Sequence, residues 1–104
     1  MIFVTTDTIS GKNITETLGT VRGSTVRARN LGRDIFAGLK NIVGGEISEY
    51  TQLLADAREQ AIQRMLEDAR RSGANAVINV RFTTSQVMQG AAEMLAYGTA
   101  VKIS

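Results

Sequence analysis

Two glycines and the residues after them form the first group of side chains that could do chemistry. Gly44, Gly45 and Glu46 come directly before a long helical pattern, and Tyr50 follows one turn later. Backbone N–H groups at the start of a helix can bind an anion or a small ligand. The same glycines also suit a sharp corner between two helices, and the stretch lacks the Lys-Ser/Thr pair of a P-loop. We favour the corner and keep the four residues as candidate ligand contacts.

A basic cluster forms the second group, made of Arg22, Arg27, Arg29 and Arg33. Arginines can pair with the phosphates of a nucleotide or a nucleic acid. No aromatic residue is interleaved with these four, although base stacking generally requires one. We therefore favour ion pairs with acids of this chain or of a neighbouring subunit and do not expect nucleic acid as a partner. A nucleotide or nucleic acid bound through residues 22–33 is the first alternative.

The third group could bind a metal ion. The chain contains no cysteine and no histidine, so thiolate and imidazole ligands are missing. The remaining donors show no recognisable ligand spacing; they are Asp7, Glu16, Glu46, Glu49, Glu93, Met65, Met88 and Met94. We predict no metal ligand within one chain, while a ring of carboxylates around a symmetry axis could still bind a cation.

Catalysis has the weakest support. Serine, threonine, tyrosine and lysine are present, but none stands beside an evident base, and no two carboxylates have a telling spacing. Arg58 and Tyr97 could serve a site between subunits, although bonding to local polar groups is the simpler role for both. We predict no catalytic residue and infer no cofactor. An enzyme with a site between subunits is the second alternative.

The composition indicates one soluble domain over residues 1–104. Its 43% hydrophobic and 21% charged residues are typical of a globular protein, and the formal net charge is +2. The N-terminus does not have the pattern of a signal peptide, and no stretch approaches the roughly 18 apolar residues of a membrane span. We therefore expect a cytoplasmic location and no membrane partner.

The strongest pattern in the chain runs from Ser48 to Gly73. Apolar residues recur there at helical spacing and are Tyr50, Leu53, Leu54, Ala57, Ala61, Ile62, Met65, Leu66 and Ala69. Ser48 suits the N-cap, and Gly73 suits the left-handed position after the last turn. A shorter helix is predicted for residues 30–43.

Four segments are predicted to be strands. They are Ile2–Thr5, Asn13–Arg29, Ala76–Thr83 and Ala92–Ile103, and a turn is expected at Ser85–Gly90. Gly19 and Gly23 are expected at β-bulges, because apolar residues change parity along the second strand. The last strand is apolar on both faces, which indicates a central position. Its small residues would let the long helix approach closely; they are Ala96, Gly98 and Ala100.

These elements predict an α+β domain with a three-stranded core sheet under one long helix. The last strand lies between the other two, which are then parallel and joined by the helix. One helix cannot cover both faces of the sheet, so we expect self-association. The short strand Ile2–Thr5 should pair with the sheet edge of a neighbouring subunit, and such a contact between unlike surfaces closes into a ring or extends into a fibre.

Four stretches together resemble the YbjQ family, also known as the "putative heavy-metal-binding" domain family. They read VRGSTVRARNLGRDI, GLKNIVGGEISEYTQLLADAREQAIQRM, GANAVINVRF and AYGTAV, and the resemblance covers essentially the whole chain. It implies a dodecin-like β-α-β-β subunit with the strands in the order first–third–second, assembled as a homopentamer. Members of the family have no known biochemical function.

The residues and the resemblance together predict a non-enzymatic homo-oligomer. Its partner is a second copy of the chain, and it binds a small ligand or ion at a subunit interface or in a central channel. The candidate ligand contacts are Arg22, Gly44, Gly45, Glu46, Tyr50, Arg58 and Tyr97.

The absence of cysteine and histidine leads to a prediction about soft metals. We expect titration calorimetry of the apo protein with Zn²⁺ or Cd²⁺ to show no stoichiometric site tighter than about micromolar, because the preferred ligands of these ions are missing. A stoichiometric site with a dissociation constant below that range would contradict the prediction.

Overall fold

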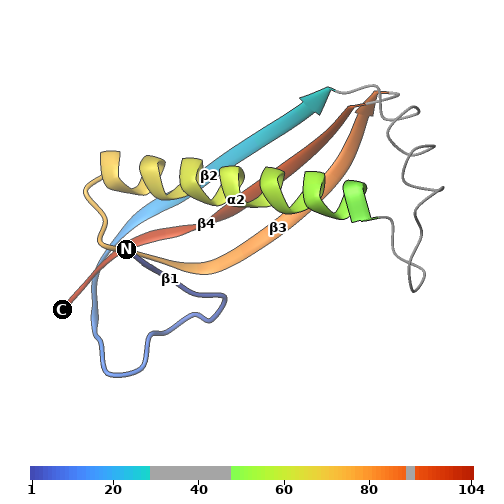
Figure 1. The fold of residues 1–104 in the computed structure, drawn as a ribbon. Helices are drawn as coiled ribbons and strands as arrows, with labels where there is room; N and C mark the ends of the chain where they lie inside the picture. The colour runs from blue at the N-terminus through green and yellow to red at the C-terminus, as the bar shows by residue number, and fades with distance from the viewer. Residues whose placement is uncertain (29–47, 89–90) are drawn as a thin grey trace.

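The computed structural model describes residues 1–28, 48–88 and 91–104. Along the chain, its elements are β1 (Ile2–Phe3), β2 (Ile14–Ala28), α2 (Ser48–Arg71), β3 (Ala76–Met88) and β4 (Ala91–Ile103) (Figure 1). The short helix predicted for residues 30–43 lies outside the described residues, as do Gly44, Gly45 and Glu46.

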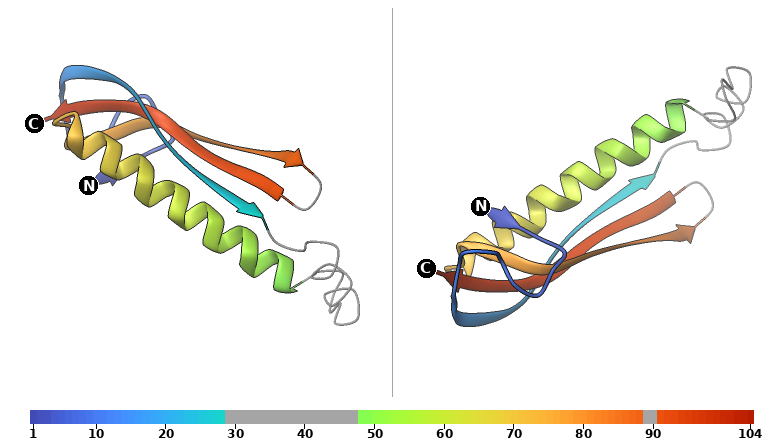
Figure 2. Two further views of the ribbon diagram at one scale, coloured as in Figure 1. Left: turned by 90° about the horizontal axis from the view of Figure 1, so that it is seen from above. Right: turned by 90° about the horizontal axis from the view of Figure 1, so that it is seen from below.

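The strands form one four-stranded mixed sheet in the order β1-β3-β4-β2. β4 lies between β2 and β3 and is antiparallel to both, so β2 and β3 are parallel to each other. α2 lies along one face of this sheet (Figure 2). The α+β class and the order of the three long strands are therefore confirmed.

The N-terminal strand pairs within its own chain, so the expected pairing with a neighbouring subunit is wrong. β1 lies parallel to the first two residues of β3. The hydrogen bonds continue past β1, since Val4 N–H donates to Val77 O and Val80 N–H donates to Val4 O, each at 2.9 Å. A short apolar strand can fit any free sheet edge, and its sequence does not select one edge over another.

The apolar stripe of α2 builds the main core against the sheet, as predicted. Its buried members are Leu53, Ala57, Ala61, Ile62, Met65, Leu66 and Ala69. The helix ends at the predicted glycine: Gly73 has a φ of 88°, and the N–H groups of Gly73 and Ala74 donate to Arg70 O and Ala69 O at 3.0 Å. These two bonds form a Schellman motif. Among the described residues, no helix is long and apolar enough to cross a membrane.

Gly23 allows the backbones of β2 and α2 to touch. A Cβ atom at this position would lie 2.2 Å from Met65 N and 2.4 Å from Ala61 O. The register of β2 does not shift at Gly23, so the bulge predicted there is wrong. The bulge predicted at Gly19 is confirmed by a register shift between Thr17 and Gly19 and by a φ of 107°. Close approach of the helix, rather than a change of phase, explains the glycine at position 23.

The small residues of β4 serve two purposes. Ala96 and Ala100 are buried in the core against α2, as expected. A Cβ atom on Gly98 would instead lie 2.9 Å from Ile78 O of β3. β3 is irregular at this point, and Asn79 has a φ of 53°. Gly98 therefore makes room for the irregular part of β3 rather than for the helix.

β3 continues to Met88, so the turn predicted at Ser85–Gly90 is wrong for residues 85–88. Sequence reasoning ended the strand early because its second half is polar. α2 packs mainly on β2, less on β4 and hardly on β3. Polar side chains are compatible with a strand here, because this half of β3 faces solvent and residues 81–86 are all exposed.

The face opposite α2 is covered at one end by the N-terminal segment. A second, smaller core forms there from Ala76, Ile78 and Val101, together with the partly buried Val4, Ile9 and Ile103. Arg81 Nη1 donates to Thr5 O at 2.8 Å where this cover ends. The N-terminal segment is thus held by β1 pairing, by apolar packing and by an arginine.

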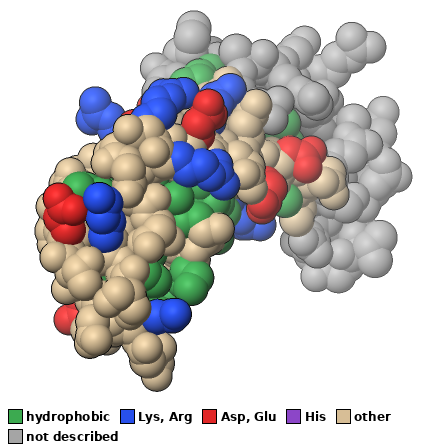
Figure 3. Space-filling view, turned by 90° about the vertical axis from the view of Figure 1, so that its left-hand side faces the viewer, with side chains coloured by type: hydrophobic (Ala, Val, Ile, Leu, Met, Phe, Trp, Pro, Cys, Tyr) green, Lys and Arg blue, Asp and Glu red, His purple; other side chains and the backbone are tan. Residues whose placement is uncertain are grey.

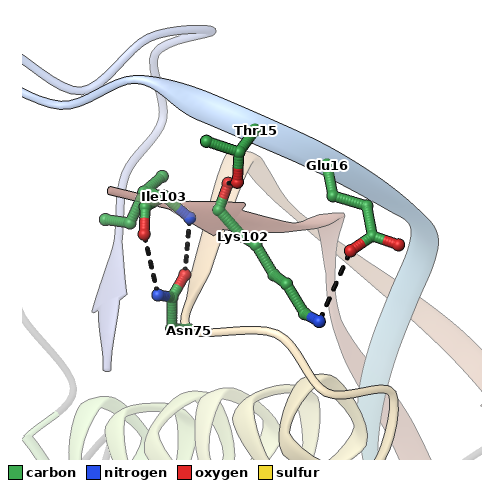
Figure 4. Close-up of polar contacts among 5 residues, drawn as sticks. All are labelled: Thr15, Glu16, Asn75, Lys102 and Ile103. Carbon is green, nitrogen blue, oxygen red and sulfur yellow. Dashed lines mark hydrogen bonds and ion pairs between the residues drawn. The ribbon is translucent and has the colours of Figure 1, made fainter.

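Polar contacts fasten the C-terminal end of β4 to the rest of the sheet (Figure 4). The Asn75 side chain bonds to both backbone groups of Ile103: Nδ2 donates to its carbonyl at 3.0 Å, and Oδ1 accepts from its N–H at 2.7 Å. On the other side, Thr15 Oγ1 donates to Lys102 O at 3.2 Å, and Lys102 pairs with Glu16 at 3.4 Å. Asn75 therefore acts like one more strand residue beside β4.

The close contact at Gly23 leads to a stability prediction. We expect Gly23→Ala to lower the free energy of unfolding by about 3 kcal/mol, because the new methyl group meets backbone atoms that cannot move independently. Gly11→Ala is the matched control, since Gly11 has a φ of 78° and open space around its Cβ position. It should cost about 1 kcal/mol of backbone strain. Urea unfolding measures both, and an equal cost for the two variants would contradict the proposed contact.

Candidate functional site

Two of the predicted ligand contacts, distant in the sequence, are neighbours in the sheet. Arg22 of β2 is the register partner of Tyr97 of β4. Partners in an antiparallel ladder project to the same face, with Cβ atoms about 4.5–5.5 Å apart. Both side chains are exposed, and Tyr97 keeps 39% of its surface accessible. This pair is the centre of the candidate site.

β3 adds a residue that sequence reasoning missed. Arg81 is the register partner of Tyr97 on its other side, so the tyrosine lies between two arginines on three adjacent strands. We call Arg22, Tyr97 and Arg81 the arginine–tyrosine row. In a regular hairpin, the partner of Tyr97 on β3 is found by counting the same number of residues back from the β3–β4 connection. Two register shifts, between Ile78 and Arg81 and between Gln86 and Met88, make that count fail.

The row lies on the sheet face opposite α2. Ala96 is buried against α2, so Tyr97, the next residue of the strand, projects to the other side. The N-terminal segment covers one end of this face, near Ile78 and Val101. We call the remaining part the open face, which carries Arg22, Ser24, Val26, Arg81, Thr83, Ser85, Glu93, Leu95 and Tyr97.

The two arginines of the row differ in how they are held. Arg81 Nη1 donates to Thr5 O at 2.8 Å and to Val80 O at 2.9 Å, which fixes its guanidinium at the border of the open face. The Arg22 guanidinium has no hydrogen-bond or ion-pair partner within the described residues, although its backbone N–H donates to Asp68 Oδ2 at 3.2 Å. The row therefore offers one positioned cation and one available cation.

A polar groove lies on the other side of Arg22, between β2 and the last turns of α2. It encloses about 520 Å³ and is lined by Arg22, Gly23, Ser24, Arg64, Glu67, Asp68 and Arg71. Figure 3 faces the end of the molecule where α2 terminates, and shows basic and acidic side chains next to one another there. Mixed charge of this kind does not by itself select an anion or a cation.

The polar groups of the groove are largely engaged with one another. Arg64 Nη1 donates to Ser24 O at 2.6 Å, and Arg71 pairs with Glu67 at 3.0 Å. Asp68 accepts the backbone N–H of Arg22. Arg64 and Asp68 thus satisfy backbone groups on the outer edge of β2, which would otherwise be open to pairing with another strand. We assign the groove a structural role and place the candidate site on the open face.

The other predicted contacts do not join this site. Arg58 is exposed on α2, on the opposite side of the sheet from Tyr97, so the two do not meet within one chain, and a site that they share between subunits stays a prediction. Tyr50 lies in the first turn of α2, and its side chain is outside the described residues. Of the basic cluster, Arg29 and Arg33 lie outside the described residues, and so does the side chain of Arg27.

The donors in the described part of the chain do not fit a heavy metal. No group of three or more aspartate, glutamate, histidine or cysteine residues gathers there. Met65 is fully buried in the core, and Met94 Sδ accepts a hydrogen bond from Thr84 Oγ1 at 3.3 Å. Both thioethers therefore act in packing, and soft metal ions lack the thiolate and imidazole ligands that they prefer.

Comparison with known proteins finds relatives of this chain whose function is not known. The sequence model of a family described as "Putative heavy-metal-binding" matches residues 1–104. A UPF0145 protein of Methanosarcina acetivorans is 65% identical over 99% of this chain and 97% of its own length. Another, from Archaeoglobus fulgidus, is 60% identical over 99% of this chain and 95% of its length. A crystal structure of a DUF74-family protein of unknown function from Pediococcus pentosaceus has a similar fold, with a TM-score of 0.67 at 16% identity over 100% of this chain and 98% of that one.

Proposed function

The chain belongs to the YbjQ family, described as "Putative heavy-metal-binding", and from this premise we propose that it is a non-enzymatic binding protein that forms a homopentameric ring. Each subunit holds a small ligand on its open face, at the arginine–tyrosine row. The observation that carries the proposal is the exposed, in-register pairing of Arg22 with Tyr97. The proposal departs from the family description in its ligand, because the chain has no cysteine and no histidine, and the thioethers of Met65 and Met94 are engaged in packing.

The shape of one subunit supports assembly. Its Cα radius of gyration is 16.7 Å and its extents are 52 × 27 × 16 Å. A compact domain of this size has a radius of gyration of about 13 Å. An elongated chain buries less apolar surface than a compact one, and large apolar residues are exposed on several elements: Ile2, Phe3, Ile14, Val26, Phe82 and Tyr97.

The outer edge of β3 is the surface best suited to a neighbouring copy. Among the described residues, no strand pairs with this edge beyond Val80. Phe82 is the partner of Ala96 and so projects to the helix side, where it keeps 42% of its surface exposed. The stretch from 81 to 88 contains no lysine and no proline, the residues that commonly protect an edge strand. An unpaired backbone edge and an exposed aromatic side chain thus occur together.

The two edges of the sheet are unlike, and this supports a ring. The β2 edge is bonded by Arg64 and Asp68 at Ser24 and Arg22, whereas no described residue pairs with the β3 edge beyond Val80. A contact that uses the β3 edge therefore meets a different surface on the next subunit. Contacts between unlike surfaces close into rings when the rotation allows. The number five and the dodecin-like subunit come from the family resemblance, and we propose a cytoplasmic location for the ring.

The assembly can be tested with a pair of charge variants. Light scattering coupled to size exclusion should give about five times the chain mass of 11.2 kDa for the wild type. Phe82→Lys should shift the protein to smaller species, because it places a charge in the proposed contact. Val26→Lys is the matched control and should stay assembled, since Val26 is 55% exposed but lies on the open face.

Three outcomes would count against the assembly proposal. A wild-type monomer at micromolar concentration would refute self-association. A ring of another size would refute the number taken from the resemblance and leave the contact in place. Dissociation by Val26→Lys but not by Phe82→Lys would move the contact from the β3 edge to the open face.

Ligand binding at the row can be followed through tyrosine emission. The chain has two tyrosines and no tryptophan, so Tyr50→Phe leaves Tyr97 as the single reporter. We expect at least one member of a panel of phosphate, pyrophosphate, citrate and nucleoside phosphates to change the emission with a saturable curve. Arg22→Gln in the same background should weaken that response, because it removes one cation of the row. No response to any member would contradict binding of a small anion at the row.

A further inference from the structure

We infer that the arginine–tyrosine row binds a nucleoside phosphate, with the base against Tyr97 and the phosphate groups at the flanking arginines. The inference rests on the proposed binding function and names the chemical class of its ligand. Three observations carry it: an exposed aromatic ring, a cation on each side of it, and an adjacent row of the open face that has hydroxyl groups and no carboxylate.

The aromatic residue stands in the strand between β2 and β3. Tyr97 lies on β4, and on the same face of that strand its neighbours Leu95 and Thr99 are half-buried. An exposed aromatic ring in the middle of a sheet face offers a flat apolar surface at a fixed position. Bases stack on such rings regardless of their identity, because every base has a π-face.

The cations lie where the phosphate of a stacked nucleotide could reach them. Arg22 and Arg81 are the two register partners of Tyr97, so each is one strand away from the ring. A guanidinium can bind phosphate oxygens through two parallel N–H groups. Arg81 is already oriented by Thr5 O and Val80 O, and Arg22 has no described partner to give up.

Charge around the row favours an anion. The next row of the open face consists of Ser24, Leu95 and Thr83, which adds hydroxyl groups but no carboxylate. Glu93 lies four residues from Tyr97 along β4, roughly 13 Å away at the rise of an extended strand. On the open face, Glu93 is therefore the one carboxylate, and the two arginines of the row outnumber it. Glu67 and Asp68 lie on the other side of Arg22, in the groove, where Arg71 and the Arg22 N–H engage them.

A single nucleotide fits this surface better than a nucleic-acid strand or a bare anion. Tyr97 is the one aromatic among the open-face residues, whereas single-stranded nucleic acid generally stacks successive bases on several aromatics. The nearby Phe82 projects to the helix side and cannot extend the platform. A bare phosphate would use the arginines but leave the exposed tyrosine without a role.

Calorimetry on the assembled wild-type protein separates the parts of the ligand. ADP, AMP, adenosine and pyrophosphate are titrated at one fixed, low ionic strength. We expect ADP to bind about tenfold more tightly than either pyrophosphate or adenosine, because each of these keeps only half of the contacts. Equal affinity for ADP and pyrophosphate, or no binding of ADP at millimolar concentration, would overturn the inference.

Variants of the row test which residue holds which part. Tyr97→Leu should weaken ADP about tenfold and leave pyrophosphate unchanged, because it removes the ring and keeps an apolar side chain. Arg22→Gln should weaken both about tenfold. Arg58→Gln is the control, since Arg58 is an exposed arginine on the opposite side of the sheet, and it should change neither. An unchanged ADP affinity in Tyr97→Leu, with an unchanged melting temperature, would also overturn the inference.

The experiments give different results when the nucleoside-phosphate inference fails and when the proposed function fails. A ring that binds pyrophosphate as tightly as ADP keeps the proposed small-ligand function and loses the nucleoside phosphate. A monomer that binds ADP with the expected loss in Tyr97→Leu loses the ring and keeps the ligand class. A short oligonucleotide that binds more tightly than ADP per molecule, with a steep salt dependence, would assign the row to nucleic acid and overturn the inference.

Discussion

The structure depends on the backbone contact between α2 and β2 at Gly23. Because no side chain separates them there, the helix packs most closely on the outermost strand of the sheet instead of over its middle. Two consequences follow from that position. Arg64 and Asp68 reach the outer edge of β2 and bond to its backbone, and α2 hardly covers the far side of the helix face, along β3. The position of the helix thus protects the β2 edge of the sheet and leaves β3 largely without helix contacts.

The N-terminal segment completes this division of the sheet into different surfaces. It pairs with the first part of β3, packs on the face opposite α2, and ends its cover where Arg81 bonds to Thr5 O. The arginine that anchors the segment is also a member of the arginine–tyrosine row. The proposed ligand site therefore begins where the cover of the second core stops, and the proposed subunit contact begins where β1 stops pairing.

The elements that follow from local patterns were predictable from the sequence. The stripe of α2 fixed which helix face is buried, the glycine after the last turn fixed its end, and the two apolar faces of β4 fixed its central place. Features set by a second, distant segment were not predictable. The partner of β1, the reason for Gly23 and the end of β3 each depend on which strand or helix lies next to them, and no local pattern encodes that.

The candidate site shows the same limit. Arg22 and Tyr97 were singled out for their residue types, but their pairing across 75 positions needs the β2–β4 register. Arg81 was missed because the irregular part of β3 changes which residue faces Tyr97. The description of the family as "Putative heavy-metal-binding" did not help in finding the site, since this chain contains neither cysteine nor histidine.

The central claim is that the β3 edge belongs to assembly and the open face to the ligand. Hydrogen exchange on the assembled protein tests both in one experiment. Arg22 N–H points away from β4 to Asp68, so Tyr97 bonds to Arg81 on β3 instead. The alternate amides of β3 at Phe82 and Thr84 then point outward. The account predicts slow exchange of these two amides in the ring without ligand, and added protection near Tyr97, but not near Phe82, with ADP. Fast exchange at Phe82 and Thr84 in an intact ring would contradict it.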